Sequence, residues 1–439
     1  MTRPRKPFTP SRRSLLSGGA AALGGASLAR AATEPAQNPA AAPESDAAAQ
    51  FQRFHGLHQA GIVTPRPATG MVAAFDVTAT SLDELERLFR LLSERIAFLM
   101  QGGPAPTADP GFPPPDSGIL GPVIAPDNLT ITVALGASLF DERFGLGPLK
   151  PKHLQRMRRF RNDALDGALC HGDLLLQFCA NTADTNIHAL RDILKNAPDL
   201  LLLRWKQEGT VPVLRPKHSE PAESARNLLG FRDGTANPDA SDRGLMNHLV
   251  WVQPGSEEPE WAANGSYQVV RIIRNFVERW DRTPLGEQEA IMGRQKASGA
   301  PIGGKREYDE PAYADDAEGK RTRLDAHIRL ANPRRPETQG SRMLRRPFNY
   351  SNGVTRAGQL DMGLLFICFQ QDLERSFIAV QKRLDGEPLE EYIKPVGGGY
   401  FFALPGVPDA GSHLGAGLIG AARGIVPAAT STSTRKTGD

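Results

Sequence analysis

Three short segments of the sequence carry side chains that could act together on iron and oxygen. His327 lies in the run L-D-A-H-I-R-L-A-N-P-R-R, Arg345 follows eighteen residues later, and Asp233 lies in G-F-R-D-G-T-A-N-P. A neutral imidazole can be an axial ligand of haem iron, and a carboxylate can transfer protons. A guanidinium is a permanent cation that stabilises a departing anion. The set therefore contains the parts needed to hold a haem iron and cleave a peroxide.

Each of these residues also has an ordinary explanation when it is taken alone. The chain has nine histidines, and one histidine is more often structural or on the surface than a ligand. The Asp-Gly and Asn-Pro pairs of the aspartate segment are common turn dipeptides. An arginine is usually a solvated surface residue, and Arg346 directly follows Arg345 as its rival. The residue types alone leave these alternatives open.

Taken together, however, the three segments closely resemble those of the dye-decolourising peroxidases. The resemblance is closest to the periplasmic deferrochelatase/peroxidase branch linked to bacterial iron uptake, and it covers nearly the whole mature chain. It implies that His327 is the proximal ligand of the haem iron. It also implies that Asp233 moves the peroxide proton and that Arg345 stabilises the leaving hydroxide, since the family's distal arginine lies eighteen residues past the ligand histidine.

Further cofactor contacts are expected around these residues. Alternation along a strand places Leu364 and Phe366 on one face, and we assign both to the apolar wall of the haem site. Asp233 and Arg345 should also contact the cofactor, and Asn349 is expected to add a hydrogen bond. The carboxylate that supports the ligand histidine is expected in the run P-L-E-E-Y, at either Glu390 or Glu391.

The resemblance implies a peroxidase with one haem b per chain. Such an enzyme reduces hydrogen peroxide, oxidises organic donors or dyes, and releases iron from haem with the porphyrin intact. A homodimer is expected. The main alternative is a non-catalytic periplasmic haem-binding carrier, which needs His327 but has no use for Asp233 and Arg345 together. A chlorite-cleaving or haem-decarboxylating enzyme would lack the G-F-R-D-G aspartate, and an exported binding protein without haem would need none of the three.

Composition is typical of a globular protein. The chain has 439 residues, 40% of them hydrophobic and 23% charged, which is sufficient for two domains with buried cores. The formal net charge of +3 is too small to predict binding to nucleic acid. Three cysteines lack metal-type spacing and cannot all pair, so we expect buried thiols at Cys170, Cys179 and Cys368.

The pattern of elements predicts an α+β protein with two ferredoxin-like domains and antiparallel sheets. The resemblance supports this duplication and implies the dimeric α/β-barrel-like superfamily. Each domain follows a β-α-β-β-α-β order. We place the first domain at residues 51–213 and the second at 222–423, with the boundary in the polar stretch 216–227. The expected strands are 71–77, 129–135, 173–180, 200–206, 265–273, 363–370 and 400–404, and the expected helices 82–100, 185–196, 285–294 and 372–384.

The amino-terminal sequence has the pattern of a targeting segment. Arg12 and Arg13 precede a short run rich in alanine and glycine that ends at Ala31. A paired arginine before such a run is typical of a signal for the twin-arginine export machinery, so residues 1–31 are the expected signal peptide and the periplasm the expected location. Residues 32–50 are expected to be a disordered linker, and residues 424–439 a disordered tail.

Overall fold

The computed structural model describes residues 48–214 and 223–424. The predicted signal peptide lies outside these residues, as do nearly all of the predicted linker and tail. All described residues fall within one compact unit. Within them, no helix combines the length and the apolar character needed to cross a membrane.

The first half of the described chain is a four-stranded antiparallel sheet with two long helices. The sheet order is β4-β5-β1-β6. This is the ferredoxin-like order, in which the first and third strands are central. The elements are β1 (Thr69–Val77), α1 (Leu82–Gln101), β4 (Thr130–Gly136), β5 (Leu174–Ala180), α2 (Ala183–Asn196) and β6 (Leu201–Thr210), with a small hairpin of β2 (Gly103–Pro104) and β3 (Val123–Ile124).

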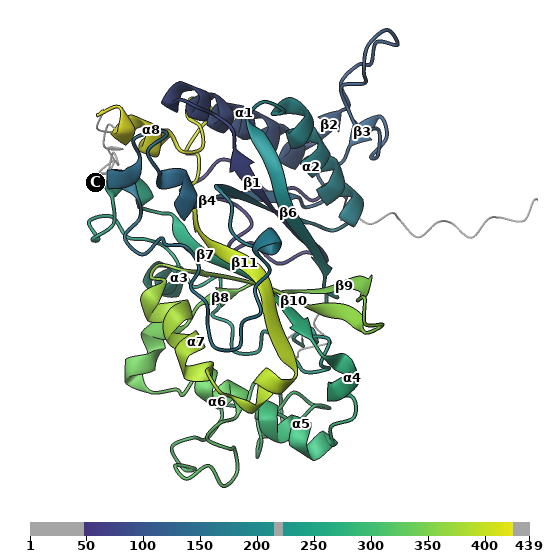
Figure 1. The fold of residues 1–439 in the computed structure, drawn as a ribbon, viewed down its shortest axis with the longest axis vertical. Helices are drawn as coiled ribbons and strands as arrows, with labels where there is room; N and C mark the ends of the chain where they lie inside the picture. The colour runs from purple at the N-terminus through teal and green to yellow at the C-terminus, as the bar shows by residue number, and fades with distance from the viewer. Residues whose placement is uncertain (1–47, 215–222, 425–439) are drawn as a thin grey trace, which may run out of the picture. The chain divides into compact units, whose positions relative to one another are not determined.

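Helix α1 forms where the sequence predicts it. The Ser81 hydroxyl accepts a hydrogen bond from the Glu84 amide and so satisfies one of the free donors of the first turn. The apolar side chains recur at helical spacing and are buried against the sheet. Helix α2 begins in the same way, with the Thr182 hydroxyl as its cap. Both helices contact strands of the first sheet and each other (Figure 1).

The second half repeats the strand order, but different helices cover its sheet. Its sheet runs β9-β10-β7-β11 and is also antiparallel, with β8 paired to the end of β10. The strands are β7 (Ser266–Asn275), β8 (Leu344–Arg345), β9 (Phe348–Val354), β10 (Leu360–Gln370) and β11 (Ile393–Ala403). The helices are short: α3 (Arg243–Leu249), α4 (Val277–Trp280), α5 (Leu285–Met292), α6 (His327–Ala331), α7 (Ala379–Leu384) and α8 (Ala416–Ala422).

The two sheets join at both edges and close into a ring. Strand β11 pairs with β4 over Phe401–Ala403, and β6 meets β9 through Thr210 and Asn349. In each case the fourth strand of one half meets the second strand of the other. Side chains from both sheets fill the inside of the ring, among them Leu175, Ile272 and Leu365. The predicted fold class is confirmed, and the two halves share one closed sheet.

Two element predictions need correction. The predicted strand 400–404 begins seven residues earlier, at Ile393. Its glycines do not favour a strand, but Cβ atoms at Gly397 and Gly398 would come within 2.7 and 1.9 Å of the carbonyl oxygens of Leu169 and Val270. Close backbone packing therefore requires glycine there. The predicted helix 372–384 is a π-helical segment, Glu374–Ile378, followed by α7. The three cysteines are buried and free, as predicted.

Candidate haem site

A cavity lies over the outer face of the second sheet. Leu364 and Phe366 of β10 and Ile273 of β7 line it from the sheet. Their neighbours Leu365 and Ile272 point into the ring interior instead, as alternation along a strand requires. Helices α6 and α7 and the segments around Asp233 and Tyr313 form the other walls. The long connection between α5 and β8 thus leaves space over this sheet.

His327 is the first residue of α6, and its side chain lines the cavity. The helix is short because the next turn runs into Asn332-Pro333, and proline disfavours helical backbone at the residue before it. The imidazole Nδ1 lies 2.7 Å from Oε2 of Glu387, a carboxylate with only 4% of its side chain exposed. This contact engages Nδ1 and leaves Nε2 available as a ligand atom.

Two opposing effects set the charge state of this imidazole. Burial lowers the pKa of His327, but the charge of Glu387 and the hydrogen bond to it together raise the pKa by more, and the net pKa lies above the ordinary value. The carboxylate therefore holds a proton on the ring and orients it. This is the arrangement expected of a metal-ligating histidine with a carboxylate behind it.

The carboxylate behind His327 is Glu387, so the expectation of Glu390 or Glu391 is wrong. The Glu390 carboxylate accepts a hydrogen bond from the Gly386 amide, and Glu391 is exposed. Both lie in a 3-10 helix that begins at Pro388. Glu387 precedes that proline, with extended backbone. Pro388 thus separates Glu387 from the turn that carries the other two, but nothing local in this segment indicates that Glu387 faces His327.

Asp233 lies in a tight loop between two glycines with positive φ. Gly230 has a φ of 86° and Gly234 a φ of 125°, a region that residues with a side chain rarely adopt. A Cβ atom at Gly230 would lie 2.5 Å from the Lys296 side chain. Both positions therefore favour glycine because of their backbone conformation. Asp233 lines the cavity, with 15% of its side chain exposed.

Arg345 also lines the cavity and contacts Asp233. Its Nη1 donates a hydrogen bond of 2.8 Å to Oδ1 of Asp233. The Asn237 side chain fixes the backbone of Arg345, accepting from its amide at 2.8 Å and donating to its carbonyl at 3.0 Å. Sequence reasoning missed this role of Asn237. Arg346 is buried and does not line the cavity. It donates to the carbonyls of Ile62 and Thr64.

Asn349 is not brought to the cavity. Its side-chain amide donates a 2.8 Å hydrogen bond to the carbonyl of Arg226, and it is absent from the lining. Asn349 lies on β9 opposite Leu364 of β10, so it neighbours the site through the sheet. The structure thus assembles His327, Asp233, Arg345, Leu364 and Phe366 around one cavity and leaves Asn349 outside it.

The cavity suits a flat apolar group with anionic substituents. Aliphatic and aromatic side chains cover the sheet side, and the lining contains six arginines: Arg232, Arg271, Arg294, Arg334, Arg342 and Arg345. Among the described residues that line it, Nε of Arg232, Nε of Arg342 and the hydroxyl of Tyr313 are buried without a hydrogen-bond partner. Buried polar atoms normally have partners. A haem, with its apolar ring, its carboxylates and an iron that binds imidazole, fits this set.

Family comparisons agree with the geometry. The family profile described as "Dyp-type peroxidase, N-terminal" matches residues 59–210, and that described as "Dyp-type peroxidase, C-terminal" matches residues 224–408. The chain therefore belongs to the Dyp-type peroxidase family, and it is a haem-dependent peroxidase.

Individual relatives include a curated Escherichia coli protein called deferrochelatase. It is 60% identical over 412 residues, which is 93% of this chain and 97% of that protein. A Shigella flexneri protein of the same name is 58% identical over 411 residues, again 93% and 97% of the two chains.

Solved structures are similar as well. A DyP-type peroxidase from Cellulomonas bogoriensis has a TM-score of 0.75 at 36% identity, covering 85% of this chain and 99% of that one. Ferric DtpA from Streptomyces lividans has a TM-score of 0.76 at 34% identity, covering 86% and 100%.

Proposed function

We propose that this protein is an exported peroxidase that carries one haem b per chain on His327, uses Asp233 and Arg345 to cleave hydrogen peroxide, and releases iron from haem. The observation that supports it best is the 2.8 Å contact between Asp233 and Arg345 in the cavity that His327 lines. A proton-transfer group and a fixed cation beside a haem ligand are what peroxide cleavage needs.

The ligand side of the site would hold the iron. Nε2 of His327 is the atom available to the metal, while Glu387 keeps the Nδ1 proton and the orientation of the ring. A strongly hydrogen-bonded imidazole is a better electron donor. When bound, haem supplies the redox chemistry, and the protein supplies ligand, proton transfer and charge. Leu364 and Phe366 exclude water from the sheet side.

The Asp233 and Arg345 side would handle the peroxide. The Asp233 carboxylate takes the proton from one peroxide oxygen and returns it to the other, so that water is the leaving product. The Arg345 guanidinium stabilises the negative charge that develops on the departing oxygen. It also holds the Asp233 carboxylate in place through the Nη1 contact. Cleavage of the oxygen–oxygen bond requires two electrons, which the bound haem would supply and organic donors would return one at a time.

A haem carrier without turnover is the alternative, and the same pair of residues argues against it. A carrier needs a ligand and apolar walls. It has no need for a partly buried aspartate held against an arginine in the cavity, because desolvating both groups costs free energy. An absorption spectrum of the purified protein, taken before and after addition of peroxide, separates the two. A carrier's Soret band stays unchanged by stoichiometric peroxide, and a peroxidase's band changes and recovers when a donor is added.

Iron release is proposed from the similarity to proteins called deferrochelatase. As iron leaves, two protons take its place on the ring nitrogens, so intact porphyrin and free ferrous iron must appear in equal amounts. The assay supplies reduced haem to the protein, detects porphyrin by its fluorescence and traps ferrous iron with a chelator. Iron without porphyrin would indicate breakage of the ring instead.

Export through the twin-arginine machinery and residence in the periplasm are proposed from Arg12, Arg13 and the run that ends at Ala31. Replacing both arginines by lysine keeps the charge but removes the pair that the receptor reads. We expect the precursor to remain in the cytoplasm, as measured by fractionation. Undiminished periplasmic protein from this variant would contradict the proposal. A homodimer is likewise proposed, and light scattering of the purified protein tests it.

A further inference from the structure

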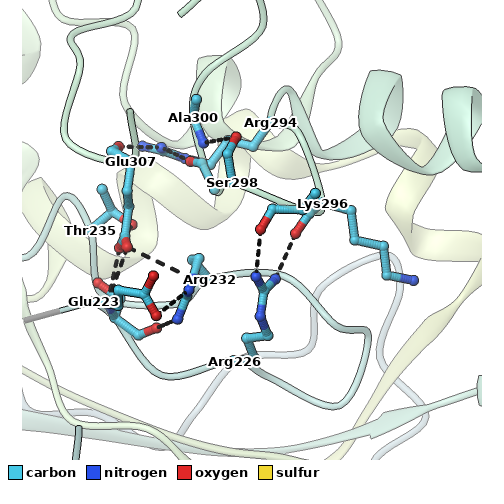
Figure 2. A network of polar contacts seen from close by, with 12 residues as sticks. Glu223, Arg226, Arg232, Thr235, Arg294, Lys296, Ser298, Ala300 and Glu307 are labelled. Carbon is cyan, nitrogen blue, oxygen red and sulfur yellow. Dashed lines mark hydrogen bonds and ion pairs between the residues drawn. The ribbon is translucent and has the colours of Figure 1, made fainter. Parts of the chain in front are cut away.

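A buried carboxylate that lies outside the haem cavity lining contacts the loop that carries Asp233. Glu307 belongs to the long connection between α5 and α6, and only 7% of its side chain is exposed. It accepts a 2.8 Å hydrogen bond from the Thr235 hydroxyl, and its two oxygens lie 3.1 and 3.2 Å from the Ser224 amide. Figure 2 shows the Glu307 carboxylate reaching to Thr235 and Arg232.

Glu307 contacts residues that precede and follow Asp233 in the sequence. Arg232 precedes Asp233, and its Nε lies 3.8 Å from Oε2 of Glu307, while Thr235 follows two residues later. Only 8% of the Arg232 side chain is exposed, and its Nη1 donates to the Ser224 carbonyl at 2.8 Å. Its other carboxylate partner, Glu223, is 55% exposed and so contributes little. Glu307 is therefore the buried carboxylate near Arg232, at ion-pair distance but without a hydrogen bond to Nε.

The connection that carries Glu307 is itself fixed to the same loop. Nη1 of Arg294 donates to the Glu307 carbonyl at 3.0 Å and to the Gly299 carbonyl at 2.6 Å. Arg226, at the start of the Asp233 loop, donates to the carbonyls of Lys296 and Ala297 (Figure 2). Arg294 therefore holds the connection together internally, and Arg226 joins it to the Asp233 loop. Glu307 contacts residues on each side of Asp233.

We propose that Glu307 is a positioning residue for Asp233, acting through Arg232 and Thr235 to aim the carboxylate at the peroxide. A loop whose glycines permit several conformations needs such external contacts to hold one of them. Proton transfer is sensitive to placement, since a shift of about 1 Å can reduce a rate about a hundredfold. The inference rests on the proposed role of Asp233.

The test uses two variants of the haem-loaded protein. Glu307→Ala removes all the contacts, and Thr235→Val keeps the side-chain volume but removes the hydroxyl that donates to Glu307. Stopped flow follows the Soret change on mixing with hydrogen peroxide, with rates expressed per bound haem. We expect each variant to slow this reaction by about tenfold or more. Thr235→Ser, which restores the hydroxyl, should recover most of the rate.

Asp127→Ala is the matched control. Asp127 is also buried, and its Oδ2 accepts hydrogen bonds from the Thr182 amide and from the hydroxyls of Thr182 and Thr185, but it lies in the first half of the chain. Its loss should lower Tm at least as much as Glu307→Ala does, because each removes a buried carboxylate from backbone and hydroxyl donors and Asp127 also has a positive φ of 46°. The peroxide rate per haem should stay unchanged.

A double-mutant cycle with Asp233→Asn tells a positioning role from a merely structural one. If Glu307 acts through Asp233, Glu307→Ala and Thr235→Val should add less than about twofold to the loss already caused by Asp233→Asn. A full additional loss in that background would overturn the proposal, as would a wild-type rate in both single variants. Should Glu307→Ala fail to fold, Thr235→Val alone decides. A wild-type rate in Asp233→Asn itself would instead remove the proposed role of Asp233.

Discussion

The two halves of the chain have the same sheet and differ in what covers it. Each sheet has its first and third strands in the centre, and their edges meet to close one ring. In the first half, α1 and α2 cover the outer face of the sheet, and their side chains pack against it. In the second half, short helices and a long irregular connection cover the corresponding face and leave the cavity.

The third strand of each sheet makes the difference concrete. In β5, Leu176 on the outer face is fully buried beneath the helices. In β10, Leu364 and Phe366 on the outer face are only partly buried and line the cavity. The alternation along the strand is the same. The cavity therefore depends on replacing two long helices by segments that carry His327 and Asp233.

Loss of the ligand histidine should have the largest effect. His327→Ala removes the only protein atom proposed to bond the iron, so the purified protein should contain little haem, and added imidazole should restore binding. Haem content is measured by the Soret absorbance per protein. His188→Ala is the control from the first half, since His188 is buried and forms a hydrogen bond with the Ser117 hydroxyl. Full haem content in His327→Ala would mean that another histidine is the ligand.

The ion pair at the cavity should matter for peroxide cleavage and its counterpart elsewhere should not. Asp233→Asn and Arg345→Leu should each retain haem and slow the reaction with peroxide about a hundred- to ten-thousandfold, the usual contribution of acid–base groups. Asp173 and Arg143 form a similar contact, at 2.9 Å, in the first half. Asp173→Asn should leave the peroxide rate unchanged under the same stopped-flow conditions. Equal slowing in both would indicate a general loss of structure.

Removing the carboxylate behind the ligand should have an intermediate effect. Glu387→Gln deletes the charge that raises the pKa of His327, so in the apoprotein that pKa should fall. A protonated imidazole cannot bind iron, so haem uptake by the variant should persist to lower pH than in the wild type. Above both pKa values its haem affinity should be about ten- to a hundredfold weaker, because the ligand is a poorer donor. Haem titrations across pH test both statements, and an unshifted pH profile would contradict the first.

The smallest effect on function is expected from matched leucine-to-alanine changes in β5 and β10, the third strand of each sheet. Leu176→Ala should lower the free energy of unfolding of the apoprotein by about 2–5 kcal/mol, because it leaves a cavity in a packed core. Leu364→Ala removes side-chain atoms that already face a cavity, so we expect less than about 1.5 kcal/mol. Chemical denaturation of both apoproteins measures the difference. Equal values would show that the two faces are packed alike.

Local patterns in the sequence were sufficient for much of the fold. Helix α1 has a serine cap and a regular apolar face, and β10 alternates clearly, so both could be predicted within a few residues. Strand β9 was missed because its residues, Phe348–Val354, are mostly polar and exposed beyond Tyr350. Strand β11 was predicted too short, because the carbonyls that require its glycines lie in distant segments.

In the candidate site, too, local segments identified some residues, while others depend on contacts between distant parts of the chain. His327, Asp233 and Arg345 could be selected because their segments resemble a known family, and the structure brings all three to one cavity. Glu387 and Glu307 could not, since each acts on a residue more than fifty positions away in the chain. No local pattern records such a pairing. Their roles depend on how the connection between α5 and β8 folds back over the second sheet.

Closure of the ring also fixes an order of events during synthesis. Strand β4 finds its outer partner only in β11, some 270 residues later in the chain, and β6 finds its own in β9. Until those strands emerge from the ribosome, the first half exposes two open sheet edges, which are sites where other chains can add as strands. A chain stalled before β11 would therefore leave the β4 edge unpaired, and chaperones that bind strand edges should bind it in preference to the finished protein.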